Sequence, residues 1–138
     1  MYTKIFTTLP QEAKNIRIEV FMKEQGFENE FVDIDTISHH IVVFDEGKPI
    51  GTCRFFKENN HYTIGRVAVL KEYRNQHIGN LLLESAENEI KKLNGDLIVV
   101  HAQVRVSPFY EKQGYIQFGQ IDDDEGVPHM WMKKKIQY

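Results

Sequence analysis

The fold is decided between residues 64 and 83, where the chain reads IGRVAVLKEYRNQHIGNLLL. This stretch begins inside a predicted strand and ends inside a predicted helix. Within the strand, Val67 and Val69 share one face. Arg66 and Ala68 share the other face.

A polar turn, residues 74–77, connects this strand to the helix. The first backbone N–H groups of a helix have no partner within it, and they lie at the positive end of the helix dipole. Such a junction is an anion site that suits a pyrophosphate. On spacing alone, an ordinary capping turn explains the same residues equally well.

The helix carries the strongest periodic signal in the chain. Apolar residues recur every three or four positions, at Ile78, Leu81, Leu82, Ala86, Ile90 and Leu93. This spacing predicts an amphipathic helix with one buried face, and Asn94–Gly95 is expected to end it.

The remaining segments give the order of the elements. We predict strands at residues 2–6, 41–44, 50–56, 62–70, 96–102, 115–120 and 129–133, a first helix from Pro10, and a short helix from Ser107 to Gly114. Two of them, residues 41–44 and 50–56, flank a glycine-containing turn and should pair as a hairpin. The order predicts an α/β sandwich with a mixed sheet.

Two places interrupt this regular pattern. Gly65, inside the strand, indicates a bulge or a close approach of another segment. Between residues 24 and 38 the period is lost and turn-forming residues gather, namely Gly26, Asn29, Asp33 and Asp35. We expect a loop or a broken helix there, and long loops are often functional.

Composition bounds the function. A chain of 138 residues with 41% hydrophobic and 27% charged residues is typical of one globular domain, here residues 1–138. The longest apolar run, residues 97–100, is far below the roughly 20 residues that span a bilayer. With no basic and apolar leader at the N-terminus, we expect a cytoplasmic protein without a membrane partner.

Charge and cysteine content narrow the function further. A net charge of −3 gives no field for phosphate backbones, so nucleic acid is not expected as a partner. Cys53 is the lone cysteine and is more readily explained as a small buried residue than as a nucleophile. The histidines His39, His40, His61 and His101 fit no zinc spacing, so we predict no metal.

Residues 64–83 resemble the core acetyl-CoA motif of the GNAT superfamily of N-acetyltransferases. That motif is Gln or Arg, two residues, Gly, one residue, then Gly or Ala. Arg74 and Gly79 match it, whereas His77 stands at the first glycine. Histidine tolerates a positive φ better than most residues, so the departure concerns the backbone of the loop.

The resemblance extends over nearly the whole chain. Residues 107–115, SPFYEKQGY, are similar to the family's short helix beside the thiol of the coenzyme. Residues 20–25, 38–43, 101–103 and 126–129 resemble the ElaA and YjcF branch. The family implies a mixed, mostly antiparallel sheet flanked by helices on both faces, with acetyl-CoA as co-substrate.

The resemblance also implies a coenzyme site. Val67, Ala68 and Val69 would pair through their backbone with the pantetheine arm, and a splayed strand would polarise the thioester carbonyl. Gln103 would contact the pantetheine, and Phe109 and Tyr110 would lie next along the coenzyme. The pyrophosphate would be held by residues 74–80, namely Arg74, Asn75, Gln76, His77, Ile78, Gly79 and Asn80.

Amide formation defines the catalytic groups to look for. The amine, with a pKa of about 10 if it resembles lysine, must lose a proton, and the thiolate benefits from a proton donor. Tyr110 is the expected donor by family position, unless it only packs the short helix. His129 is equally suited as base, substrate binder or structural residue. By resemblance, Glu24 would receive the amine, whereas Arg66 would bind an acidic group of the substrate. Alternatively, each residue forms a salt bridge, and the two could pair with each other.

Several functions remain open from the sequence. The main hypothesis is direct N-acetylation of a small-molecule or peptide amine in a ternary complex, by a chain that is monomeric or forms a homodimer. A catalytically weak or inactive module that binds acetyl-CoA or another protein is the alternative. O-acetylation or another acyl donor fits the same fold. The acidic run at residues 122–125 either attracts a cationic substrate or, as we favour, is a solvated loop.

Overall fold

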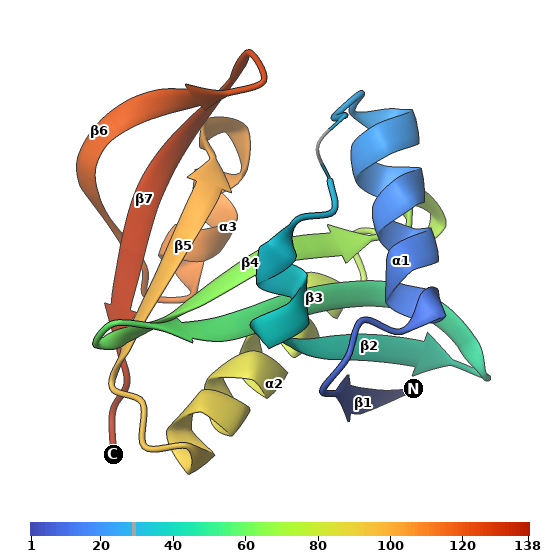
Figure 1. Cartoon of the computed structure of the whole chain (residues 1–138), viewed down its shortest axis with the longest axis horizontal. Helices are drawn as coiled ribbons and strands as arrows, with labels where there is room; N and C mark the ends of the chain where they lie inside the picture. The colour runs from blue at the N-terminus through green and yellow to red at the C-terminus, as the bar shows by residue number, and fades with distance from the viewer. Residues whose placement is uncertain (29) are drawn as a thin grey trace.

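Seven strands form one sheet in the computed structural model, which describes residues 1–28 and 30–138 (Figure 1). The strand order is β1-β2-β3-β4-β5-β7-β6. The strands span β1 Tyr2–Phe6, β2 His39–Asp45, β3 Lys48–Glu58, β4 His61–Val69, β5 Leu97–Gln103, β6 Ile116–Asp124 and β7 Val127–Lys135. Only β4 and β5 pair in parallel, so the expected mixed, mostly antiparallel sheet is confirmed.

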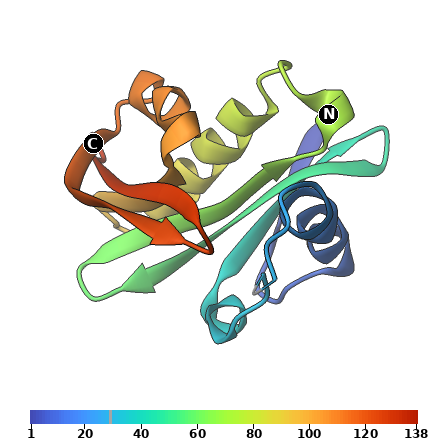
Figure 2. The same cartoon turned by 90° about the horizontal axis from the view of Figure 1, so that it is seen from above.

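Helices cover both faces of the sheet (Figure 2). Alternation along β2 sets the two faces, because Val42 packs with α1, Gln11–Arg17, whereas Val43 packs with α2, Ile78–Lys92. The helix α3, Ser107–Lys112, lies on the α2 face. The larger core therefore lies under α2 and α3. Within the described residues, no helix has the length and apolar character needed to cross a membrane.

A bulge interrupts β4 at the centre of the sheet. Thr52 pairs with Ala68 and Arg54 pairs with Gly65, so two steps along β3 match three along β4. Arg66 occupies the extra position and has a φ of 52°, in the left-handed region. The bulge that Gly65 indicated is therefore present, one residue further along the chain.

The strands β4 and β5 separate soon after they meet. Their parallel pairing covers only residues 62–64 with residues 98–100. Beyond Ile64 the two strands diverge, as Figure 1 shows. Backbone groups of β4 after the bulge are thus free of β5, which opens a slot in the sheet.

The first helix changes character midway. After α1 the chain continues as a π-helix, Ile18–Glu24, in which Gln25 N–H donates to the Val20 carbonyl at 3.2 Å. The segment predicted to be irregular then contains a 3₁₀ turn, Asp33–Ile37, and its Asn29 lies outside the described residues. Seven residues of π-helix are unusual, and such insertions often occur at functional sites.

The end of α2 follows the prediction. Asn94 adopts a φ of 64°, and its N–H donates to the Lys91 carbonyl at 3.0 Å. The N–H of Gly95 donates to the Ile90 carbonyl at 2.9 Å, which completes a Schellman motif. A Cβ on Gly95 would lie 2.7 Å from the Tyr62 ring, so only glycine fits.

Candidate active site

Two adjoining cavities lie at the slot between β4 and β5. The larger has a volume of ≈ 580 Å³ and runs along the end of β4, the turn before α2, and α3. All predicted coenzyme residues line it except Gln76 and Gln103. Gln76 bonds the Glu72 carbonyl at 3.5 Å, and Gln103 lines the smaller cavity.

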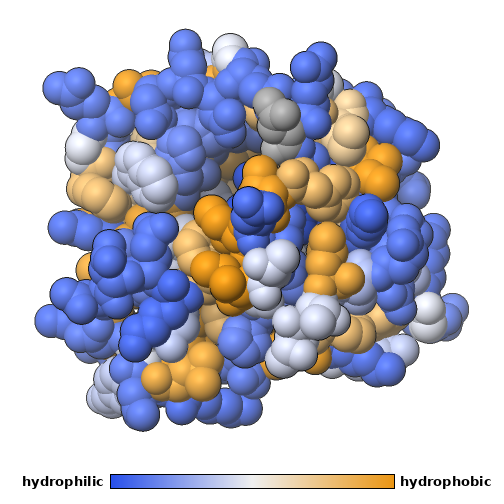
Figure 3. All heavy atoms as spheres, viewed as in Figure 1, coloured by the Kyte–Doolittle hydropathy of each residue, from blue (hydrophilic) through white to orange (hydrophobic). Residues whose placement is uncertain are grey.

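The smaller cavity has a volume of ≈ 130 Å³ and lies on the α1 side of the sheet. Its lining comes from the π-helix and the following loop, from β4 and β5, and from the β6–β7 turn, and includes Phe21, Phe27, Glu30, Arg66, His101, Gln103, Asp124, Glu125 and His129. In the face viewed in Figure 3, apolar side chains gather near the middle and hydrophilic ones surround them.

One set of residues lines both cavities. These residues are Gln25, Val67, Arg105, Val106 and Tyr110. A group held in the larger cavity and one held in the smaller cavity would therefore face the same side chains. This shared wall is where an acyl group could pass from donor to acceptor.

The turn before α2 has an unusual backbone. His77 has a φ of 62° and Asn75 a φ of 64°, and both tolerate this region better than most residues. Histidine thus adopts a left-handed conformation that favours glycine. A Cβ on Gly79 would lie 3.1 Å from the Phe109 ring, so the second glycine allows α3 to approach α2.

Glu24 holds the arginine of this turn. Its carboxylate accepts hydrogen bonds from both terminal nitrogens of Arg74, at 2.6 and 2.8 Å. Hydrogen bonding from Arg74 lowers the pKa of Glu24. Glu24 lines neither cavity, and it does not pair with Arg66, since the structure gives each a different partner.

Tyr110 is buried in the shared wall, 8% exposed. Its ring meets those of Phe109 and Tyr115 edge-on, with centroids 5.1 and 5.7 Å apart. Burial raises the pKa of Tyr110, so the hydroxyl keeps its proton at neutral pH. Tyr110 therefore lines both cavities with its hydroxyl protonated.

His129 is also buried, and its hydrogen bond fixes its tautomer. Nδ1 lies 2.8 Å from the Val127 carbonyl oxygen, which can only accept, so Nδ1 carries the proton. Nε2 of the neutral ring then keeps a lone pair, as a base requires. The Phe27 ring approaches His129 edge-on at 6.5 Å.

His101 was considered in the sequence only as a metal ligand, and its place in the cavity was not predicted. It lines the smaller cavity, its ring stacks on Trp131 at 4.3 Å, and it lies 4.8 Å from the His129 ring. Its Nε2 is 2.8 Å from a carboxylate oxygen of Asp122. Alternation along β5 and β7 brings these side chains to one face. Residues 1–28 and 30–138 hold no group of three or more metal-binding side chains.

The acidic run is more than a solvated loop. Residues 122–124 end β6, and Asp124 and Glu125 line the smaller cavity. Asp122, Asp123 and Glu125 are exposed, as we expected of a solvated segment, but residues 122–124 belong to a strand instead of a loop. Cys53 is 1% exposed, and burial raises its pKa to about 12, which agrees with a small core residue.

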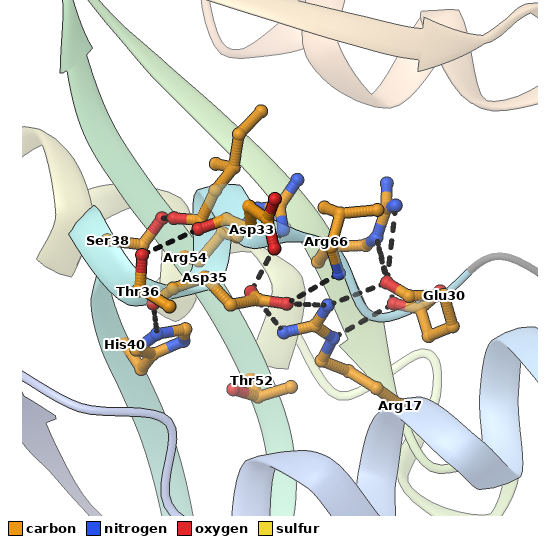
Figure 4. Close-up of polar contacts among 12 residues, drawn as sticks. Arg17, Glu30, Asp33, Asp35, Thr36, Ser38, His40, Thr52, Arg54 and Arg66 are labelled. Carbon is orange, nitrogen blue, oxygen red and sulfur yellow. Dashed lines mark hydrogen bonds and ion pairs between the residues drawn. The ribbon is translucent and has the colours of Figure 1, made fainter.

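A buried ion cluster borders the smaller cavity (Figure 4). Arg17 bonds Glu30 at 2.9 Å and Asp35 at 2.8 Å, Arg54 bonds Asp35 at 2.9 Å, and Arg66 bonds Glu30 at 2.8 Å. We refer to these five residues as the ion cluster. It fastens the segment after the π-helix to α1, β3 and β4.

Burial and pairing act differently on the two acids of the ion cluster. Burial raises the pKa of Glu30, and the nearby Arg66 and Arg17 only partly oppose it. Burial also acts to raise the pKa of Asp35, but hydrogen bonds from Arg17 and Arg54 lower it to about 2. Arg17 lies on the apolar face of α1 beside Ala13 and Val20, a position from which a buried pair could have been predicted.

The strand splay, the turn before α2 and the two cavities suit an acyltransferase, which moves an acyl group from a coenzyme to an acceptor. A family model described as an acetyltransferase (GNAT) domain matches residues 7–136, so the chain belongs to the GNAT family of N-acetyltransferases. The resemblance drawn from the motifs is confirmed.

Curated relatives agree with this assignment. The uncharacterized N-acetyltransferase YjcF of Bacillus subtilis is 32% identical over 127 residues, which cover 90% of this chain and 91% of YjcF. The protein YyaT of the same species is 32% identical over 91% of this chain and 88% of its own. ElaA of Escherichia coli is 23% identical over 88% of this chain and 84% of its own.

Solved structures show the same fold. A protein of Lactobacillus plantarum superposes with a TM-score of 0.88 at 26% identity and covers 99% of this chain and 100% of its own. An aminoglycoside 6'-N-acetyltransferase complexed with coenzyme A has a TM-score of 0.79 at 16% identity, covering 98% of this chain and 97% of its own.

Proposed function

We propose that this protein transfers the acetyl group of acetyl-CoA directly to the amine of a small acceptor. The observation that carries the proposal is the shared wall: Val67, Val106 and Tyr110 face both cavities. Donor and acceptor can then meet without a covalent enzyme intermediate. The coenzyme A complex of an aminoglycoside acetyltransferase with this fold supports the choice of donor.

The residues of the larger cavity fit a coenzyme. The turn with two left-handed residues leads into the N-terminus of α2, which offers unpaired N–H groups and a positive dipole end to a pyrophosphate. The end of β4, freed from β5, offers backbone groups for a pantetheine arm. When bound, acetyl-CoA would supply a thioester-activated acetyl group.

Two side chains would then manage the protons. His129 Nε2 accepts a proton from the acceptor ammonium, and the freed nitrogen forms the new C–N bond as the C–S bond breaks. Tyr110 donates its hydroxyl proton to the departing thiolate, and the second proton, which the nitrogen loses as the amide forms, restores the hydroxyl. The proton held by His129 is released to water, so one proton leaves for each ammonium group that is acetylated. The alternative is that His129 binds the substrate or has only a structural role.

A coenzyme-binding module with weak or no catalysis is the second candidate. The Glu24–Arg74 pair favours it, because a pyrophosphate must compete with Glu24 for that guanidinium. The single domain over residues 1–138, the cytoplasmic location and the homodimer stay predictions.

Calorimetric titration with acetyl-CoA and with free CoA tests the proposal. A panel of amines follows, with thiol release as readout. Binding accompanied by amine-dependent thiol release supports an acetyltransferase. Binding without release for any amine favours the module, and no binding at millimolar coenzyme would contradict both.

A further inference from the structure

We propose that the acceptor is a small amino-carboxylate whose anionic group binds Arg66. The inference rests on the proposed function and names the acceptor class for the same site. It is carried by the charge balance of the ion cluster, by the side chain that this cluster exposes to the smaller cavity, and by the opposite charge on another wall of that cavity.

The ion cluster contains more positive than negative charge. Three guanidinium groups, from Arg17, Arg54 and Arg66, face two carboxylates, from Glu30 and Asp35. The excess is one positive charge when both acids are ionised. His40 adds no charge, because burial lowers its pKa. A buried charge without a counter-charge is costly, so an anion that binds here is stabilised.

The polar partners of the ion cluster are also incomplete. Nε of Arg54 is buried and has no hydrogen-bond partner among the residues that the structure describes. The Glu30 carboxylate oxygen Oε1 serves Arg17 and Arg66 at the same time, at 2.9 and 2.8 Å. Arg66 therefore shares its Glu30 counter-charge with Arg17.

Arg66 is the member through which the ion cluster reaches the cavity. Its side chain is 26% exposed, compared with 1% for Arg17 and 7% for Arg54. Only Arg66 and Glu30 of the five line the smaller cavity. A guanidinium with planar donors matches a carboxylate in geometry as well as charge.

The wall from the β6–β7 turn carries the opposite charge. Asp124 and Glu125 line the cavity together with His129. An ammonium group is attracted to this wall, where the proposed base can deprotonate it. Each charged group of an amino-carboxylate thereby meets an opposite charge, the carboxylate at Arg66 and the ammonium at the acidic wall.

The size of the cavity limits the rest of the acceptor. A volume of ≈ 130 Å³ offers roughly ten water-sized positions. An acceptor of β-alanine size fits, whereas the body of a folded protein does not.

Matched acceptors test the inference. Thiol release at saturating acetyl-CoA is measured with β-alanine, with n-propylamine, which lacks the carboxylate, and with 1,3-diaminopropane, which reverses that charge. We expect kcat/KM for β-alanine to exceed kcat/KM for each of the two other amines by about tenfold or more. Arg66→Gln should abolish this preference for β-alanine, and Arg66→Lys should retain part of it. Lys23→Gln, which removes an exposed cation that lines neither cavity, should keep it. A ratio near one in the wild type would overturn the inference and leave the proposed function intact.

A second measurement does not need turnover. Propionate, which cannot be acetylated, is titrated into the wild type while the arginine Nε–H signals are followed by NMR. The signal that is missing in Arg66→Gln should shift and saturate. A shift without any acetylation would support the anion site and contradict the proposed function. No shift together with equal rates for the matched acceptors would contradict the anion site alone.

Discussion

Glu24 and Arg74 lie fifty positions apart, and a two-pronged hydrogen bond joins the end of the π-helix to the turn before α2. The pair is about one third exposed, so it contributes little to stability, on the order of 0–1 kcal/mol. Its effect should appear in coenzyme binding, because a pyrophosphate needs the same guanidinium.

Glu24→Gln is therefore expected to tighten acetyl-CoA binding about two- to fivefold. Isothermal titration at low salt measures the change in Kd. Glu19→Gln, which alters an exposed acid on the same helix, should leave Kd unchanged. Weaker binding by Glu24→Gln would show that the pair positions Arg74 for the coenzyme.

Tyr110→Phe should lower kcat by roughly 10- to 100-fold, because the thiolate loses its proton donor. The Kd for acetyl-CoA should change less than about twofold, since the ring and its packing remain. Tyr62→Phe, which removes a hydroxyl from another buried tyrosine, is the control. Equal kcat values for Tyr110→Phe and wild type would remove Tyr110 from the donor role.

Asp35→Asn should destabilise the protein at pH 7 by about 3–5 kcal/mol, because Arg17 and Arg54 lose a buried counter-charge. The ordinary pKa of 3.8 falls to about 2 on folding. That stabilisation, roughly 2 kcal/mol, is fully present above pH 4 and is lost as the pH falls through 2.

Glu30 acts in the opposite sense, because its pKa is raised, so its protonation favours the folded state at low pH. Urea unfolding at pH 7 and at pH 3 separates the effects. The difference in the free energy of unfolding between wild type and Asp35→Asn should be smaller at pH 3 than at pH 7. Asp33→Asn, which alters an exposed acid of the same turn, should leave the free energy of unfolding unchanged at both pH values. An equal loss of stability in Asp33→Asn and Asp35→Asn would refute the role of the ion cluster.

His77→Gly tests the departure from the family motif. Histidine already has the left-handed φ, so glycine should change the Kd for acetyl-CoA by less than about twofold. His77→Val, which is strained at that φ, should weaken binding by about tenfold. Marked tightening by His77→Gly would instead indicate a partly degraded coenzyme site.

The sequence was most informative where local patterns determine structure. The spacing from Ile78 to Leu93 predicted α2 because one face of that helix is buried, and Asn94–Gly95 predicted its end because left-handed backbone and close packing require those residues. The turn before α2 was predictable because Arg74 and Gly79 keep a motif spacing, whereas its binding of an anion stays a prediction.

The acceptor side was not predictable in the same way. The ion cluster depends on pairings between residues 13 to 36 positions apart, from Arg17 with Glu30 to Arg66 with Glu30, for which no local period exists. His101 reaches His129 only because β5 pairs with β7. The π-helix could not be predicted either, because the apolar spacing that predicted α1 does not distinguish a π-helix from an α-helix.

The sheet topology also has a consequence for synthesis on the ribosome. The interior strand β5 pairs over its whole length only with β7, Val127–Lys135, since β4 pairs with three of its residues. One edge of β5 therefore stays open until nearly all of the 138 residues have been translated. The nascent chain can complete the β1–β4 meander early, but its centre closes last, and the exposed apolar edge in that interval is where a chaperone would be needed most.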